Sequence, residues 1–190
     1  MLKVASELFQ ARGYEAVSID EVIAKTGGTK TNVYTLFGGK AELFAAAVNE
    51  QCQKLKHTFA DLELSGLSPE EALRRSGRAY LTALLSKASV RQHRLMVAES
   101  GRFPALGRRW FKAGPEAARN ALGAQLAKLP GLSSKEEATQ IATAFLNMLD
   151  GEPLMRQLVS GGTLSTREIN GYVDDAVTVM LQGASVSKRR

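Results

Sequence analysis

The stretch of sequence that decides the fold spans residues 18–43 and reads SIDEVIAKTGGTKTNVYTLFGGKAEL. It opens with a Ser-x-x-Glu capping box at Ser18, which marks the start of a helix. The apolar face of that helix ends at Gly27-Gly28, where a positive φ costs little. Thr29 then caps a second short helix, which ends at Gly38-Gly39. The pattern predicts two short helices joined by a glycine turn, the layout of a helix-turn-helix motif.

The two sides of the second short helix differ in chemistry. Val33, Leu36 and Phe37 share one side and predict an apolar face that packs inward. The other side carries hydroxyl, amide, phenol and ammonium groups, which reach base edges or phosphates in a major groove. We therefore predict that this helix contacts DNA through Thr29, Lys30, Thr31, Asn32, Tyr34 and Thr35.

Lys40 begins the next helix, where the helix dipole makes a cation unfavourable. A phosphate at that N-terminus would resolve the mismatch, because the exposed N–H groups and Lys40 would bind it together. We therefore add Lys40 to the predicted DNA contacts.

A longer stretch resembles the TetR family of bacterial repressors, namely residues 4–48, VASELFQARGYEAVSIDEVIAKTGGTKTNVYTLFGGKAELFAAAV. The resemblance implies an all-α fold, with a three-helix DNA-binding domain followed by a helical bundle that binds a ligand and dimerises. It also implies that Thr31, Asn32 and Tyr34 contact DNA, with Ser18 and Lys40 on phosphates.

The chain departs from the family pattern in two places. Gly28 stands where an apolar residue usually follows the turn glycine, which predicts a looser turn. The sequence starts at Met1 already inside the first helix, without the basic lead-in that most relatives carry. These departures leave open a second interpretation, a helical adaptor that has lost DNA binding.

Composition narrows the class of protein. The 190 residues, 44% hydrophobic, suffice for one or two globular domains, and no apolar run reaches the roughly 18 residues of a membrane helix. We expect a cytoplasmic protein without a signal peptide, in which the single Cys52 is a buried structural thiol. The net charge of +6 suits a nucleic-acid partner, but residues 1–60 contribute only +1 of it.

The remaining sequence reads as further helices. Capping boxes at Ser68, Ser134 and Ser165 mark three helix starts. We expect loops at 63–68, 130–133 and 159–163, and helices near 40–60, 69–88, 91–101, 104–129, 134–150 and 166–182. The predicted domains are residues 1–45 for DNA binding and 46–184 for ligand binding and dimerisation, followed by a disordered basic tail at 185–190.

The segment MVAESGRFPAL, residues 96–106, resembles the AefR-like subgroup of the TetR family. Such a resemblance implies a cavity for a small-molecule effector in the helical body. The candidate lining residues are Tyr80, His93, Met96, Glu99, Arg102, Phe103, Trp110, Phe111, Phe145 and Met148. An ordinary core position is the commoner role for each of these residue types, and Glu99 and Arg102 are also compatible with an ion pair between them.

The helices near 134–150 and 166–182 each carry a wide apolar face. The resemblance implies that these faces form a homodimer interface of four helices, which would bring two DNA-reading heads to one side. The alternative is that both faces are buried within one subunit.

Known catalytic motifs are missing from the sequence. It contains no G-x-S-x-G, P-loop, H-E-x-x-H or CxxC pattern, and its two histidines lack partners at metal-ligand spacing. We therefore predict a protein that is not an enzyme and has no cofactor or metal. The favoured function is a repressor that a small molecule releases from operator DNA.

Overall fold

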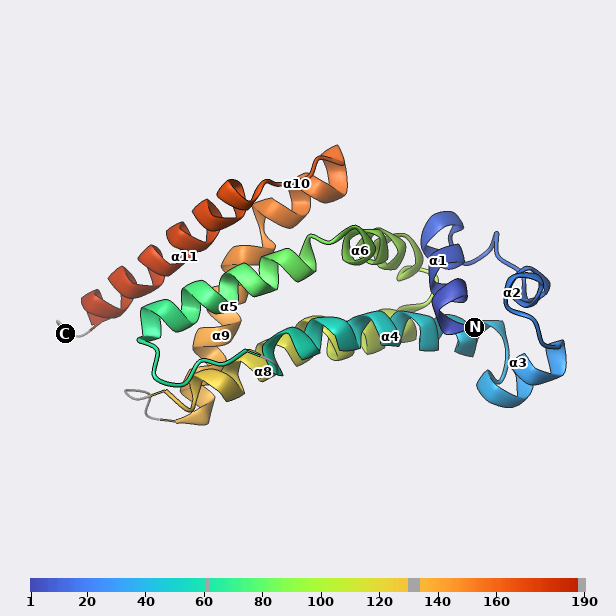
Figure 1. The fold of residues 1–190 in the computed structure, drawn as a ribbon, viewed down its shortest axis with the longest axis horizontal. Coiled ribbons are helices and arrows are strands. Elements are labelled where there is room, and N and C mark those ends of the chain that lie inside the picture. The colour runs from blue at the N-terminus through green and yellow to red at the C-terminus, as the bar shows by residue number, and fades with distance from the viewer. Residues whose placement is uncertain (61, 130–133, 188–190) are drawn as a thin grey trace. The chain divides into compact units, whose positions relative to one another are not determined.

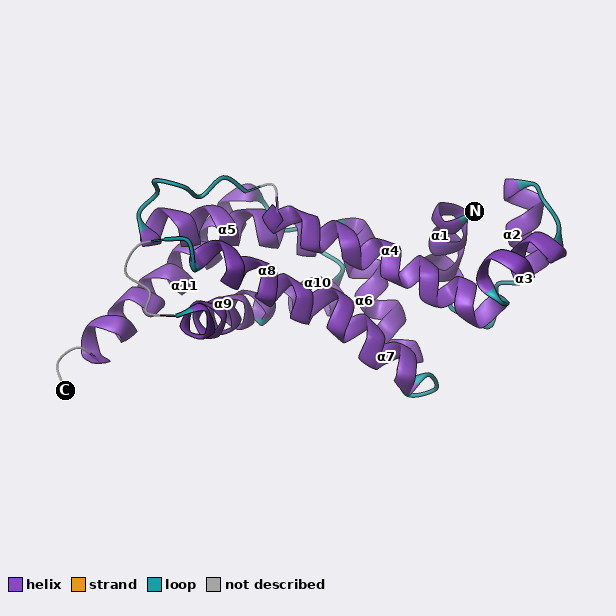
Figure 2. Cartoon of the chain, turned by 90° about the horizontal axis from the view of Figure 1, so that it is seen from below, coloured by secondary structure: helices purple, strands orange, loops and turns teal. Residues whose placement is uncertain are grey.

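The described residues of the computed structural model, 1–60, 62–129 and 134–187, form helices and connecting loops without any strand (Figure 2). This confirms the predicted all-α class. The helices divide into two compact units, and α4 (Lys40–Ala60) contributes to both of them (Figure 1). Each unit is described by itself.

Unit 1 comprises Met1–Lys54 and Lys87–Gly114. Besides the first part of α4, it contains α1 (Leu2–Arg12), α2 (Ile19–Thr26), α3 (Lys30–Phe37), α6 (Lys87–Glu99), α7 (Pro104–Phe111) and the start of a π-helical turn, η1 (Lys112–Glu116). Its core is built from fully buried apolar side chains of α1, α2, α3, α4 and α6, among them Phe9, Val33, Phe44 and Met96.

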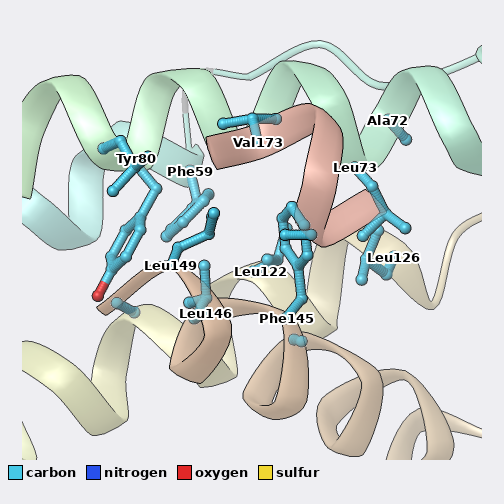
Figure 3. Close-up of a cluster of buried hydrophobic side chains, with 14 of the residues drawn as sticks. Phe59, Ala72, Leu73, Tyr80, Leu122, Leu126, Phe145, Leu146, Leu149 and Val173 are labelled. Atoms are coloured by element: carbon cyan, nitrogen blue, oxygen red, sulfur yellow. The ribbon is translucent and has the colours of Figure 1, made fainter. Parts of the chain in front are cut away.

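Unit 2 comprises Leu55–Ser86 and Pro115–Arg190. It contains α5 (Pro69–Leu84), α8 (Ala117–Leu126), α9 (Lys135–Asp150), α10 (Glu152–Ser160) and α11 (Thr166–Ser187). Phe145 and Leu149 of α9 lie among Phe59 and the apolar side chains of α5 and α8 (Figure 3). This core is dense, because a Cβ added to Gly77 of α5 would come within 2.9 Å of the Phe145 ring.

The predicted caps account for several helix starts. Ser68 and Glu71 form the complete capping box, in which each side chain bonds the backbone N–H of the other. The same reciprocal pair joins Ser165 and Glu168 at α11. Ser134 accepts a hydrogen bond from the N–H of Glu137, as expected for an N-cap residue.

The structure differs from the predicted helices in three places. Residues 152–158, for which no element was predicted, and residues 159–160, which were expected in a loop, form α10, which has a proline in its first turn. The break between α5 and α6 falls at residues 85–86, several residues before the expected position. The region expected as one helix at 104–129 consists of α7, η1 and α8.

The structure also differs from the expected domain boundary and from the expected disordered tail. Helices α6 and α7 belong to the same compact unit as residues 1–45. Helix α11 continues to Ser187, so residues 185–187 of the expected tail are helical. Residues 188–190, like the loop expected at 130–133, lie outside the described residues.

Candidate functional site

The turn between α2 and α3 is built by two caps and two glycines. Ser18 accepts a hydrogen bond from the N–H of Glu21 at 3.1 Å, and Thr29 accepts one from Asn32 at 3.2 Å. Gly27 and Gly28 both have positive φ values, 74° and 100°. The backbone conformation therefore favours glycine at position 28, because a residue with a Cβ is strained at this φ. The departure from the family pattern at this position fits the backbone geometry of the turn.

Helix α3 presents its polar side outward. Val33 is completely buried and anchors the helix in the core of unit 1, with Phe37 half-buried beside it. The side chains exposed on α3 and its cap include all of the predicted contacts on this segment, Thr29, Lys30, Thr31, Asn32, Tyr34 and Thr35. The prediction for Leu36 is wrong, since its side chain is 69% exposed and faces away from the core.

An ion pair joins the two helices of the motif. The Nζ atom of Lys30 lies 2.9 Å from a carboxylate oxygen of Asp20 on α2. The hydrogen bond to Asp20 raises the pKa of Lys30 above its ordinary value. Both side chains are exposed, so the pair contributes little to stability.

Lys40 has partners that the sequence did not predict. Its ammonium group lies 4.4 Å from the centre of the Tyr14 ring and donates a hydrogen bond to the carbonyl of Glu15 at 3.2 Å. These contacts resolve the unfavourable position of the cation without a phosphate, which corrects the reason for the prediction. Lys40 ties the start of α4 to the α1–α2 loop, and it remains a half-exposed cation near that helix end.

A second set of contacts ties the α6–α7 corner to the same loop. The Glu99 carboxylate accepts a hydrogen bond from the N–H of Tyr14 at 2.9 Å. Arg102 forms an ion pair with Glu15 at 2.6 Å, and the Phe103 ring packs edge-on against Tyr14. Glu99 and Arg102 therefore bind residues of the α1–α2 loop and do not pair with each other.

The ten candidate ligand-binding residues fall into both units. His93, Met96, Glu99, Arg102, Phe103, Trp110 and Phe111 belong to unit 1, whereas Tyr80, Phe145 and Met148 belong to unit 2. Met96, Tyr80 and Phe145 are buried core side chains, which agrees with the alternative interpretation of these positions. The Tyr80 hydroxyl donates to Asp150. Tyr80 lies in the cluster of buried side chains of unit 2 (Figure 3), and burial raises the pKa of Tyr80 far above its ordinary range. Phe111 and Met148 are exposed on their helices.

Unit 1 contains a cavity of about 210 Å³. It lies between α4, which contributes Ala45, Val48 and Asn49, and α7 with the start of η1. The residues from α7 and η1 are Leu106, Arg109, Trp110, Lys112 and Ala113. Of the ten candidates, Trp110 lines this cavity. Its ring makes an edge-to-face contact with the His93 ring, and the two ring centroids are 5.1 Å apart. Sequence reasoning missed Arg109 and Lys112, because their spacing fits an ordinary solvated helix face.

Cys52 is buried beside this region, as predicted. Burial raises the pKa of the Cys52 thiol to about 12, although a hydrogen bond from Gln92 opposes the shift. The thiol is therefore protonated at neutral pH and unreactive. Gly114 of η1 packs on it, since a Cβ at Gly114 would lie 3.4 Å from the sulfur.

The apolar faces of α9 and α11 are largely occupied within unit 2. Phe145 and Leu149 of α9 and Val173 and Val177 of α11 are buried in its core. Other apolar side chains remain exposed on the two helices, namely Ala144, Met148, Val179 and Leu181.

The described residues contain neither a metal-binding cluster nor a membrane-spanning helix. No group of three or more His, Cys, Asp or Glu side chains is arranged there to hold a metal ion. None of the helices described is both long and apolar enough to cross a bilayer.

Two family models match the chain. Residues 1–47 match the bacterial regulatory proteins of the tetR family, and residues 71–183 match the C-terminal domain of AefR-like transcriptional repressors. The regulator LmrA of Bacillus subtilis (strain 168) is 32% identical over 74 residues, which are 38% of this chain and 39% of LmrA.

Solved structures have the same fold over nearly the whole chain. A TetR-family regulator from Mesorhizobium loti MAFF303099 superposes with a TM-score of 0.83 at 23% identity, covering 95% of this chain and 93% of that one. The flavonoid-responsive regulator FrrA gives a TM-score of 0.75 at 29% identity, covering 96% and 93%. These relatives are transcriptional regulators and not enzymes, in agreement with the predicted class. The chain therefore belongs to the TetR family of DNA-binding transcriptional regulators, with an AefR-like C-terminal domain.

Proposed function

We propose that this regulator is a homodimeric repressor that binds operator DNA through α3 and is released by a small-molecule effector. The observation that carries the proposal is the polar face of α3, held outward by the buried Val33 and capped by Thr29. A rigid helix of this kind inserts into a major groove, and its side chains then meet base edges.

Each DNA contact has a proposed role. Thr31, Asn32 and Tyr34 meet bases or phosphates from α3, and Lys30 exchanges its pairing with Asp20 for a phosphate. Ser18, Thr29, Thr35 and Lys40 flank the groove, where hydroxyl and ammonium groups bind the backbone. Such contacts act in the cytoplasm, where the operator DNA lies.

The dimer is proposed to form through α9 and α11. Met148 is 39% exposed and Val179 is 56% exposed, although the opposite sides of their helices are buried in unit 2. Exposed apolar side chains on neighbouring helices favour pairing with an identical surface related by a twofold axis. A dimer would present two copies of α3 to successive major grooves, about 34–36 Å apart.

The response to an effector is supported by two observations. FrrA, whose fold this chain shares, is a flavonoid-responsive regulator. Helix α4 begins beside the DNA-binding helices, lines the cavity of unit 1 and continues into unit 2. A ligand that binds the DNA-free conformation more tightly than the DNA-bound one would shift the equilibrium towards release.

A gel-shift titration tests the DNA-binding surface. An operator is first selected from a pool of random duplexes with the full-length protein. Thr31→Ala and Tyr34→Phe should then each weaken binding, with a loss of roughly 1–3 kcal/mol for a base-specific contact. Thr82→Ala is the matched control, because Thr82 is an exposed threonine on α5 of unit 2. Undiminished binding by both α3 variants would refute the assigned surface.

Salt dependence distinguishes the repressor from the helical adaptor. Contacts with several phosphates make the logarithm of the affinity fall steeply and linearly with the logarithm of the salt concentration. A flat dependence, or the absence of any selected duplex, would favour an adaptor that has lost DNA binding.

A further inference from the structure

The cavity of unit 1 combines three kinds of chemistry. Ala45, Val48 and Leu106 give it apolar walls, and Trp110 adds an indole ring. Arg109 and Lys112 bring two positive charges to the same space, and no carboxylate is among the described residues that line it. Apolar walls with a few polar groups that fix orientation are typical of small-molecule sites.

Arg109 and Lys112 differ from some other cations of unit 1 in having no acidic partner among the described residues. Other cations of unit 1 have acidic partners, such as Arg12 with Glu21 and Arg102 with Glu15. In the part of the chain that the structure describes, Arg109 and Lys112 form no ion pair or side-chain hydrogen bond. Their charges therefore remain available to an anion that enters the cavity.

Contacts within unit 1 set the orientation of the Trp110 ring and the backbone position of Lys112. The edge-to-face contact with His93 orients the Trp110 ring, and His93 is itself bound to the carbonyl of Ser89 at 2.9 Å. The π-helical turn η1 carries Lys112 and packs through Gly114 onto Cys52 of α4. Single π-turns of this kind occur frequently at functional sites.

The size of the cavity limits the ligand. A cavity of about 150 Å³ is known to accept benzene, so 210 Å³ accommodates one aromatic ring with a short substituent. A planar ring can stack on Trp110 between the apolar walls, while an acidic substituent reaches Arg109 or Lys112.

We propose that this cavity binds a planar aromatic anion, a compound with one aromatic ring and a carboxylate, and that this compound class contains the effector. The inference rests on the proposed function, because it assigns the effector of that regulator to a place and a chemistry. Arg109 and Lys112 bind the carboxylate, and Trp110 contacts the ring.

The single tryptophan of the chain makes the proposal directly measurable. Trans-cinnamate is titrated into the full-length protein and the fluorescence of Trp110 is followed, with calorimetry as a second measurement. Trans-cinnamamide, which has the same shape without the charge, serves as the matched ligand. We expect saturable quenching by cinnamate and an affinity for cinnamamide that is weaker by about tenfold or more, as befits the loss of a charge-assisted hydrogen bond.

Three variants separate a built site from general electrostatic attraction. Arg109→Gln and Lys112→Gln should each weaken cinnamate binding by about tenfold and bring it close to that of cinnamamide. Arg108→Gln removes the same charge from the same helix without touching the cavity, and it should bind cinnamate like the unaltered protein. Equal effects of Arg108→Gln and Arg109→Gln would overturn the proposal, as would equal affinities for the two ligands.

The gel shift in the presence of cinnamate keeps this proposal distinct from the proposed function. Release of the selected operator by cinnamate, lost in Arg109→Gln, supports both. Operator binding that depends on Thr31 and Tyr34, together with no cinnamate binding, overturns the ligand assignment and leaves the DNA-binding regulator intact. Cinnamate binding without any effect on the operator overturns the assignment of the cavity to the effector.

Discussion

The two units of the chain differ in net charge and in how closely they are packed. Unit 1 contains 13 of the basic residues and seven acidic ones, so it carries the entire net charge of +6. Unit 2 has 12 of each and is electrically balanced. Unit 1 leaves a polar helix face and a cavity open, whereas the core of unit 2 is packed so closely that Gly77 has no room for a methyl group.

The division into units explains where the positive charge lies relative to the DNA-binding helices. Residues 1–60, which include the DNA-binding helices, contribute little net charge, so along the sequence the positive excess lies outside these helices. In the fold, residues 87–114, which include α6 and α7, belong to the same unit as α3, and their arginines and lysines supply that excess. A positive unit attracts the phosphate backbone over a distance of about a Debye length, in addition to the direct contacts of α3.

The largest expected effect comes from the core of unit 2. Phe145→Ala removes a completely buried ring and should destabilise the fold by about 3–5 kcal/mol. Urea unfolding followed by circular dichroism measures this loss. Gel shifts under native conditions should show a smaller loss of operator affinity for the folded fraction than a core change in unit 1 causes, because Phe145 is buried in the core of unit 2 and does not lie on the exposed face of α9.

Two controls sharpen this first prediction. Gln140→Ala, at an exposed position of the same helix, should change stability by no more than about 0.5 kcal/mol. Phe9→Ala empties the core of unit 1 and should weaken DNA binding as well as stability. If Phe145→Ala reduced the operator affinity of folded protein as strongly as Phe9→Ala, the functional separation of the two units would be wrong.

The second prediction compares the N-caps of two helices, one in each unit. Thr29→Ala removes the cap of α3 and should cost about 1 kcal/mol, because a backbone N–H loses its partner. Ser68→Ala should cost a similar amount at α5. Stability is measured by urea unfolding, and the fraying of α3 is measured by hydrogen exchange of its amides.

The functional results of these two variants should differ. Thr29→Ala loosens the helix that reads DNA, so its operator affinity should fall together with its stability. Ser68→Ala should lose stability alone, and Thr29→Ser should restore both properties of α3 because serine is an equally good cap. A loss of operator affinity in Ser68→Ala equal to that in Thr29→Ala would contradict the assignment of DNA binding to α3.

The sequence was most informative where local chemistry determines local structure. Ser18, Thr29 and Ser68 each accept the predicted N-cap hydrogen bond from a residue three positions later. The capping box is complete at Ser68, whereas the Glu21 carboxylate pairs with Arg12 and does not complete the box predicted at Ser18. The inward position of Val33, which follows from helical periodicity, is confirmed as well. Leu36 was assigned to the same face, but a two-turn helix buries only a narrow stripe and leaves it exposed.

Contacts between distant segments could not be predicted from such patterns. Lys40 reaches Tyr14 and Glu15 because the α1–α2 loop folds back beside the start of α4. Arg109 joins the cavity only because α7 packs near Val48 of α4. Each position depends on tertiary packing, and a spacing of three or four residues carries no information about it.

The smallest effect concerns the acid stability of the two capping boxes in unit 2. The Ser68 hydroxyl and N–H both donate to Glu71 and hold its pKa below the ordinary value of 4.5. Ser165 does the same for Glu168. Because the folded pKa is the lower one, this stabilisation is fully present above the unfolded value and is lost as the pH falls through the folded value.

Glu71→Gln and Glu168→Gln should therefore reduce the acid sensitivity of unfolding. Glutamine keeps the reciprocal cap but has no charge to lose, so the midpoint of urea unfolding should fall less steeply below pH 4.5 than in the unaltered protein. Both groups are solvent-exposed, which makes the change small, and the double variant should show it more clearly. Glu70→Gln is the control, since Glu70 binds Arg74 in place of a cap. Identical acid limbs for the double variant and the unaltered protein would show that these carboxylates do not set the acid limit of unit 2.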